Sequence, residues 1–147
     1  MENSNGKVLE LYITTNKEPK REEKKEISLD EGGVIGDKFH SKDIGRSVLL
    51  ASKMSYDLAK SEDIAITNGD LGENILVDFN PYELALGTRV QIGEVILEIS
   101  QNSTLCKGLS KVNSKLPKLL KNDRGIFAKV VMSGTIKLGD RVMILQN

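Results

Sequence analysis

The single cysteine, Cys106, is the residue best suited to chemistry in this 147-residue chain. It follows a polar run at residues 101–104, and apolar residues at helical spacing begin shortly after it. A helix N-terminus and nearby cations both favour a thiolate over a thiol. Lys107, Lys111 and Lys115 recur at every fourth residue and would form a basic stripe beside the sulfur. The pattern therefore indicates a nucleophilic or metal-binding thiolate.

The same residues also have simpler interpretations. A buried free cysteine often packs as a small apolar residue, and a lysine stripe is typical of a solvated helix face. A lone cysteine excludes an intramolecular disulfide and fits a reducing compartment. One cysteine and one histidine cannot supply the four ligands of a zinc cage.

A turn-rich segment at residues 32–37 opens a second cluster of ionisable side chains. Asp37, Lys38 and His40 follow its glycines, and Arg46 comes shortly after. A functional group with an altered pKa needs a partner charge and a cleft, and this cluster supplies the charges. His40 is the only histidine, and it is either part of a site or a structural residue.

Two further clusters carry polar groups that could face an anion. Residues 69–75 form a Gly-rich turn that contains Asn74. Such turns expose backbone N–H groups that can hold an anion, although a plain hairpin turn is the interpretation we favour. Arg124 precedes an apolar strand pattern, where it would either bind an anion or pair with Asp123 or Asp140.

The elements that must position these residues are mainly strands. Apolar or alternating runs predict strands at 8–13, 27–29, 46–51, 75–77, 126–132 and 141–145, and a hairpin over 88–100. Ser52 is expected to N-cap a short helix. A second helical pattern follows Cys106, and Pro117 either kinks that helix or opens another. The charged run at 17–26 predicts a solvated loop or hairpin tip.

Composition narrows the class of protein. The 21 basic and 21 acidic residues give zero formal net charge, which disfavours non-specific nucleic-acid binding. Tryptophan is absent, so the core must be mostly Val, Ile and Leu. The N-terminus, residues 1–5, is polar and no apolar run approaches membrane-spanning length, so we expect neither a signal peptide nor a membrane span. We expect one cytoplasmic domain over 1–147, without nucleic-acid or membrane partners, built as a closed or strongly curved β-barrel with a few short helices. The sequence leaves the oligomeric state open.

Taken in order, these clusters resemble a MOSC domain, the family named for the C-terminal domain of molybdenum cofactor sulfurases. The motifs are Gly-x-x-Gly-Asp-x-x-His, Arg-x-Val-Leu-Leu, Gly-x-x-Gly-Glu-Asn-Ile, a strand leading to the cysteine, Arg-Gly-Ile-Phe-Ala and a final Gly-Asp-x-Val. The resemblance is strongest over 33–145, as in a short stand-alone member. It implies a closed β-barrel with a few helices, in agreement with the strand pattern.

The resemblance also implies an activity, namely handling of the molybdenum cofactor (molybdopterin) or of sulfur bound for metal centres. Cys106 would carry a persulfide or face molybdenum directly, because a soft thiolate suits a soft metal or sulfane sulfur. Arginine suits bidentate contacts to phosphate. The residues that would shape a pocket for the anionic pterin are Asp37, Lys38, His40, Arg46, Asn74, Lys107 and Arg124.

The chain departs from the family pattern at three points. Many members have a proline just before the cysteine, where this chain has Leu105, and some carry a second cysteine downstream, where Lys107 and Gly108 stand. No pyridoxal-phosphate domain is present, so that cofactor is not expected here. A persulfide on Cys106 would therefore need a partner, either a cysteine desulfurase-like donor or a molybdoenzyme or cofactor-biosynthesis protein. The sequence leaves open a sulfurtransferase-like activity and a non-catalytic module that binds an anion or cofactor.

Overall fold

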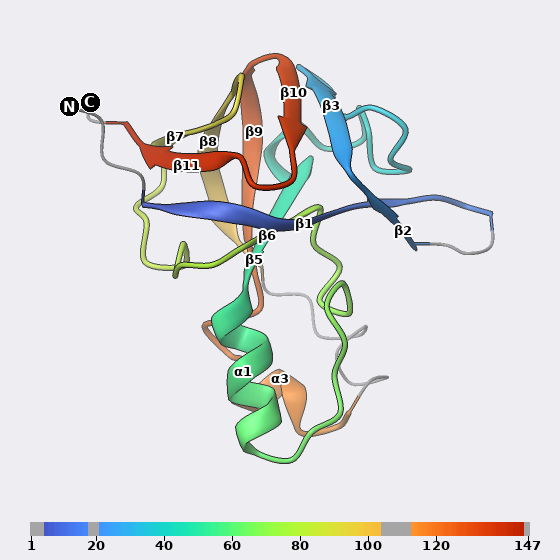
Figure 1. Ribbon diagram of the computed structural model, residues 1–147, viewed down its shortest axis with the longest axis vertical. Helices are drawn as coiled ribbons and strands as arrows, with labels where there is room; N and C mark the ends of the chain where they lie inside the picture. Colours follow the sequence, from blue (N-terminus) through green and yellow to red (C-terminus); the bar gives the residue numbers. More distant parts are fainter. Residues whose placement is uncertain (1–4, 18–20, 104–112, 146–147) are drawn as a thin grey trace.

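The computed structural model describes residues 5–17, 21–103 and 113–145. The fold is mainly β, as the sequence predicts, with short helical segments (Figure 1). The strands are β1 Gly6–Thr14, β2 Arg21–Lys24, β3 Glu26–Asp30, β4 Gly33–Val34, β5 Val48–Ser52, β6 Ile75–Val77, β7 Arg89–Ile92, β8 Val95–Asn102, β9 Ile126–Met132, β10 Gly134–Lys137 and β11 Arg141–Ile144. The helices are the 3-10 helix η1 Ile44–Arg46, α1 Lys53–Ser61 and α3 Leu116–Leu119.

Seven strands close into a barrel, in the order β11-β7-β8-β9-β5-β6-β1, because β1 also pairs with β11. That closing seam has Gly6 opposite Val142 and Lys7 opposite Arg141. β2 extends the sheet beyond β1 as a hairpin, and β10, β3 and β4 form a second, smaller sheet. The predicted barrel is therefore confirmed. Within the part of the chain that the structure describes, no helix is long and apolar enough to cross a membrane.

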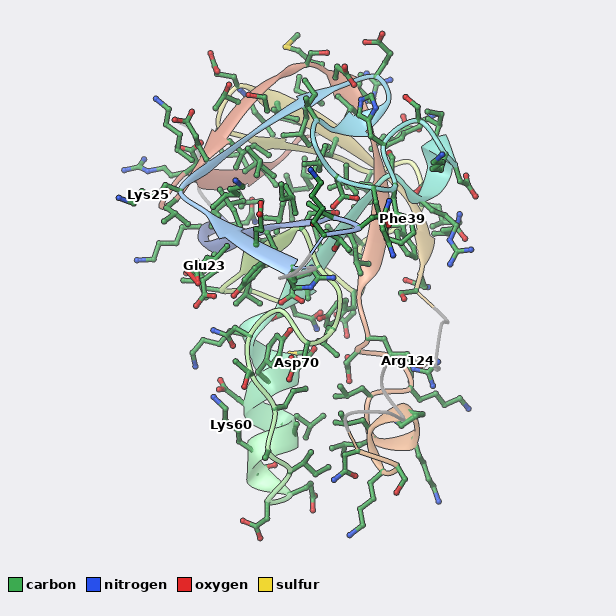
Figure 2. The ribbon with its side chains drawn as sticks, turned by 90° about the vertical axis from the view of Figure 1, so that its right-hand side faces the viewer. Glu23, Lys25, Phe39, Lys60, Asp70 and Arg124 are labelled. Atoms are coloured by element: carbon green, nitrogen blue, oxygen red, sulfur yellow. The ribbon has the colours of Figure 1, made fainter. Side chains whose placement is uncertain are left out.

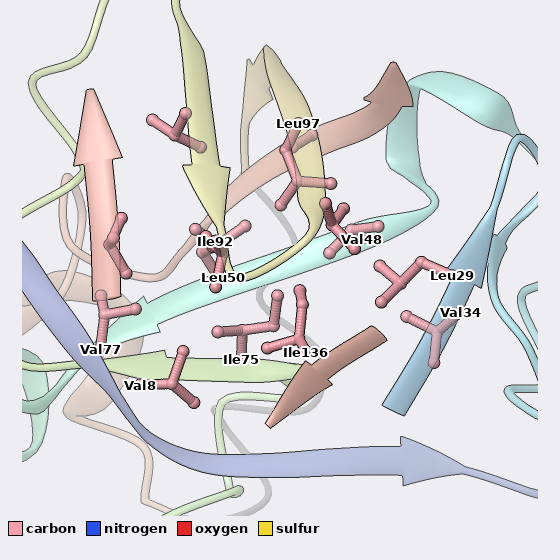
Figure 3. Packing of buried hydrophobic residues seen from close by; sticks show 14 of the residues in the cluster. Val8, Leu29, Val34, Val48, Leu50, Ile75, Val77, Ile92, Leu97 and Ile136 are labelled. Carbon is pink, nitrogen blue, oxygen red and sulfur yellow. The ribbon is translucent and has the colours of Figure 1, made fainter. Parts of the chain in front are cut away.

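The barrel interior is filled by aliphatic side chains, which we call the barrel cluster (Figure 3). Alternation along each strand sends every second residue inward, as with Val95, Leu97 and Ile99 of β8, which are all at most 1% exposed. The labelled members in Figure 3 are Val8, Leu29, Val34, Val48, Leu50, Ile75, Val77, Ile92, Leu97 and Ile136. Burial of this apolar surface holds the barrel together.

A second apolar group, the helical cluster, joins the barrel to the helices drawn below it in Figure 1. Its buried members are Ala51, Tyr56, Ala59, Ile64, Ile66, Leu71, Leu76, Leu116 and Leu120. β5 and β6 run parallel and α1 lies between them in sequence, as a parallel pair requires a crossover. The Ser52 side chain accepts a hydrogen bond from the Met54 N–H, so the predicted N-cap is confirmed.

The sequence predictions hold for most elements, including the alternative in which Pro117 opens a helix, and need correction at two places. The charged run at 17–26 contains β2, which pairs with β1, so this segment is a hairpin strand as well as a turn. The strand predicted from Arg46 begins at Val48, because Asp43 caps the 3-10 turn that includes Arg46. Pro117 lies in the first turn of α3, so it opens a helix. The helical spacing predicted directly after Cys106 lies outside the described residues.

Candidate functional site

A cavity of about 570 Å³ is lined by strand ends and turns at the level where the barrel meets the helices, which we call the waist. Figure 2 shows three of its lining residues, with Phe39 at the level of the barrel and Asp70 and Arg124 below it. The full lining is Thr14, Arg21, Asp37, Lys38, Phe39, Lys42, Asp43, Arg46, Ser47, Leu49, Asp70, Leu71, Gly72, Asn74, Ser103, Arg124 and Phe127. The site is thus assembled from strand ends and turns contributed by most of the chain.

The structure brings five of the predicted pocket residues to this cavity, and they are Asp37, Lys38, Arg46, Asn74 and Arg124. Cys106 and Lys107, predicted as the thiolate and its neighbour, lie outside the described residues. Ser103, three residues before Cys106 in the sequence, lines the cavity, and its N–H donates to the Gly125 carbonyl.

Asp37 and Asn74 form the structural floor of the cavity. The Asp37 carboxylate accepts hydrogen bonds from the Thr14 N–H at 2.7 Å and the Phe39 N–H at 3.0 Å. The Asn74 side chain donates to Asp37 at 3.2 Å and accepts from the Leu49 N–H at 3.0 Å. Both side chains are at most 6% exposed. They tie β1, β5 and the turn before β6 together, so their first role is to fix the cavity's shape.

The other two acidic residues of the lining are also engaged by backbone N–H groups. Asp43 accepts from Gly45 at 3.2 Å as the cap of η1, and Asp70 accepts from Thr67 at 2.8 Å. Each of the three carboxylates therefore accepts at least one backbone N–H, and Asp37 also accepts from the Asn74 side chain. Five cationic side chains share the same lining, so the positive charge is in excess.

The cations themselves are held by aromatic rings and carbonyl groups. The Arg46 guanidinium lies 5.0 Å from the centre of the Phe127 ring, and the Lys38 ammonium lies 5.0 Å from that of Phe39. Arg124 donates to the Pro117 carbonyl at 2.6 Å, which connects α3 to the cavity wall. Its contact with Pro117 is a partner that the sequence did not suggest, since Asp123 and Asp140 were the expected ones. These contacts orient cationic groups around one space suited to an anion.

Sequence reasoning missed Arg21 and Lys42 as cavity residues. Lys42 lies between Lys38 and Arg46 in the same cluster, so its proximity in sequence was an available signal. Arg21 belongs to the charged run interpreted as solvated. It reaches the cavity because it pairs with Thr14 across the β1–β2 hairpin, and no local pattern reveals that register.

His40 is outside the cavity lining. Its Nε2 lies 2.6 Å from the Asp30 carboxylate, and its Nδ1 contacts the Ser41 hydroxyl at 3.0 Å. The His40 hydrogen bond, aided by the Gly32 N–H, holds the pKa of Asp30 below its ordinary value. These contacts fit the structural alternative for this histidine, and its place in a pterin pocket stays a prediction.

A buried polar pair supports the Gly-rich turn beside the cavity. The Tyr56 hydroxyl lies 2.8 and 2.7 Å from the two carboxylate oxygens of Glu73, and it accepts from the Gly69 and Leu71 N–H groups. Burial raises the pKa of Glu73, although the Tyr56 hydrogen bond and the charge of Arg21 oppose that rise. The N–H groups of Gly69 and Leu71 therefore bond to Tyr56, and those of Asp70 and Gly72 bond to nearby carbonyl groups, as the turn interpretation predicts.

Comparison with known proteins identifies the family. A sequence model of the MOSC domain matches residues 36–143. The chain belongs to the MOSC domain family. The matched span of this MOSC domain includes Lys38, Arg46, Asn74 and Arg124, whereas Arg21 lies before it. A search of curated proteins found no match to the chain. MOSC domains as a family are associated with the molybdenum cofactor.

Solved structures share the fold of this MOSC domain. The YuaD protein of Bacillus subtilis is 19% identical with a TM-score of 0.83, and 98% of each chain is covered. YiiM of Geobacillus stearothermophilus is 15% identical with a TM-score of 0.72, covering 96% of this chain and 75% of YiiM. YiiM of Escherichia coli is 17% identical with a TM-score of 0.70, covering 96% and 70%. At these identities the likeness shows the fold alone.

Proposed function

We propose that this MOSC domain binds a molybdenum cofactor, a phosphate-bearing anionic pterin, in the waist cavity, with Cys106 as a persulfide carrier or metal-facing thiolate. The observation that supports it best is the cavity lining, which contains five cationic residues and three carboxylates that are engaged by backbone N–H groups. An uneven charge of this kind favours an anionic ligand.

The described residues fit such a group in size and chemistry. The cavity of about 570 Å³ falls in the range typical of small-molecule and cofactor sites. Arg46 and Arg124 carry planar guanidinium groups, which suit the oxygens of a phosphate. Phe39, Phe127 and Leu71 supply apolar walls for a flat ring. When bound, the cofactor would supply a soft metal centre that accepts sulfur or thiolate ligands.

The chemistry proposed for Cys106 is thiol exchange with a partner's persulfide. The Cys106 thiolate would attack the terminal sulfur of a donor persulfide, forming a new S–S bond as the donor cysteine leaves as a thiolate. A cysteine desulfurase-like protein is the class of donor that supplies this group. Cys106 is the only cysteine of the chain, so no second thiol of the same chain can release the sulfur.

The decisive experiment examines the protein purified from cells with and without molybdenum-cofactor synthesis. We expect molybdenum by elemental analysis, pterin fluorescence after oxidation, or the mass of one added sulfur, with the added sulfur absent in Cys106→Ala. If cofactor and added sulfur are absent from every preparation, the proposal is wrong.

A second candidate is a binding module without sulfur chemistry. It is favoured by the cationic residues of the lining, which suit an anion without any chemistry at a thiol. For such a module, Cys106→Ser would leave cofactor binding intact, whereas Arg46→Ala would abolish it. Arg89→Ala is the matched control, since Arg89 pairs with Glu98 on the barrel and is not part of the lining. Loss of cofactor binding in Cys106→Ser, with Arg46→Ala unaffected, would exclude the module.

A further inference from the structure

We infer that Arg21, supplied by the β1–β2 hairpin, is an additional anion-binding residue of the cavity, and that the buried Tyr56–Glu73 pair positions it. This inference rests on the proposed function and extends it, since it names the oxyanion of the ligand as the group that Arg21 recognises. Arg21 lies before the span matched by the MOSC family model, so the family match does not assign it.

The hairpin register brings Arg21 to the cavity. Arg21 is the first residue of β2 and lies opposite Thr14, the last residue of β1, and both line the cavity. One N–H of its guanidinium donates to the Glu73 carbonyl at 2.9 Å. A guanidinium carries five N–H donors in a rigid fork, so this bond anchors the group while other donors remain for a ligand.

The Gly-rich turn provides the surface on which Arg21 lies. A Cβ atom at Gly69 would come within 3.3 Å of Arg21 Cδ, and one at Gly72 within 3.6 Å of Arg21 Nη2. Both glycines have positive φ, +96° and +87°, which side-chain-bearing residues rarely adopt. The Arg21 side chain therefore runs close to both glycines, and Gly72 lines the cavity beside it.

Tyr56 and Glu73 hold that turn in place from below. The Tyr56 hydroxyl accepts from the N–H groups of Gly69 and Leu71, at 3.0 and 3.1 Å, and donates to the Glu73 carboxylate. Tyr56 is 1% exposed and Glu73 is 0% exposed. The positive charge of Arg21 acts on the buried Glu73 carboxyl. Tyr56 and Glu73 bond to the turn on which Arg21 lies, and Arg21 is the residue proposed to bind the anion. Tyr56 and Glu73 are therefore positioning residues.

The test uses the full chain and inorganic phosphate as the probe, titrated by calorimetry at low salt. We expect Arg21→Ala to weaken phosphate binding roughly tenfold or more, the effect typical of one charge-assisted hydrogen bond. Arg21→Lys keeps the charge but loses the fork, so an intermediate affinity is expected. Lys24→Ala is the matched control because it removes one cation from the same strand, outside the lining, and should bind like the wild type.

The positioning role is tested by a double-mutant cycle, which a general loss of stability would not reproduce. Tyr56→Phe should weaken phosphate binding in the wild-type background but add little in the Arg21→Ala background. If Tyr56→Phe does not fold, Glu73→Gln takes its place in the cycle. Additive losses would overturn the positioning role.

The two proposals fail in different ways. If the wild type binds phosphate and Arg21→Ala binds it equally well, the role of Arg21 is wrong and the proposed function stands. If the wild-type cavity binds neither phosphate nor cofactor, both are wrong.

Discussion

The barrel cluster and the waist use their buried residues in different ways. The barrel cluster is aliphatic apart from Tyr82. By contrast, the buried polar residues of the described chain lie at strand ends, in turns or in α1, and they are Thr14, Asp37, Ser47, Ser52, Ser55, Glu73 and Asn74. Apolar burial is non-directional and provides stability, whereas buried hydrogen bonds fix geometry. The difference teaches that the barrel provides the stability and the waist provides the shape of the site.

The largest effect is expected for Leu97→Ala in the barrel cluster. Leu97 is fully buried, so the lost side chain leaves a cavity and should reduce the free energy of unfolding by about 2–5 kcal/mol. Urea denaturation measures the loss, and the folded fraction should bind phosphate like the wild type. Leu86→Ala is the control, because Leu86 is 65% exposed and the change should cost less than about 0.5 kcal/mol. A loss of binding in folded Leu97→Ala protein would break the comparison.

The next effect is expected for Tyr56→Phe at the waist. The change leaves the buried Leu71 N–H without its acceptor and the Gly69 N–H with only the 3.3 Å bond to Glu73, and should cost about 1–3 kcal/mol of unfolding free energy. Tyr82→Phe is a matched control, because its buried hydroxyl also bonds the Ser52 N–H and the Ser55 hydroxyl. Both variants should lose stability in urea, but Tyr56→Phe alone should lose phosphate affinity. Equal losses of affinity would mean that the waist has no special role in binding.

The buried Glu73 carboxyl at the waist makes the unfolding free energy depend on pH. Burial raises the folded pKa of Glu73 above its ordinary value of 4.5, so the folded state binds the proton more tightly than the unfolded state. Its contribution to stability is therefore present below pH 4.5 and is lost as the pH rises toward the folded pKa. We expect Glu73→Gln to remove this decline in unfolding free energy. Urea denaturation at a series of pH values from below 4.5 upward measures it.

Glu98 on the barrel surface is the control of opposite sign. The Lys129 hydrogen bond, followed by that of Arg89, holds the pKa of Glu98 below its ordinary value. Its contribution is present above that value and is lost as the pH falls through the lowered pKa. Glu98→Gln should therefore lower stability above that value and remove the decline in stability on the acidic side. A Glu73→Gln profile parallel to the wild type would contradict the assignment.

The smallest effect is expected for Ser52→Ala at the start of α1. The Ser52 hydroxyl accepts from the Met54 N–H at 3.1 Å, and loss of this cap should cost about 1 kcal/mol in a thermal or urea unfolding experiment. Phosphate affinity should change little, since α1 stays anchored by the helical cluster. A loss of affinity comparable to that of Tyr56→Phe would show that the whole helix, rather than its tyrosine, positions the turn.

Local patterns predicted the strands, but the site depended on pairings between distant segments. Alternation at Val95, Leu97 and Ile99 was sufficient to place β8, because each face of a strand repeats every second residue. The order of motifs, through the resemblance to the MOSC family, predicted Asp37, Arg46 and three further cavity residues. Arg21 was missed because its place depends on the register of a hairpin.

The sequence predicts no role for Glu73 beyond its place in a motif, because its partner Tyr56 lies on α1 and no spacing rule connects the two residues. His40 is a different case, since the chemistry of a lone histidine looks the same whether it faces a ligand or an aspartate. Its contact with Asp30 depends on how β3 and the following turn fold against each other. Contacts of this kind are decided by tertiary structure, which sequence periodicity does not encode.

The seam between β1 and β11 has a consequence for how the chain folds. It joins residues from opposite ends of the described chain, Gly6 to Val142 and Lys7 to Arg141, and pairings so distant in sequence are slow to form. The cavity likewise joins Thr14 of β1 to Phe127 of β9. A polypeptide emerging from the ribosome cannot complete this cavity before Phe127 has been synthesised. A time course of the recovery of phosphate binding after dilution from urea would therefore measure how fast these distant segments come together around the cavity.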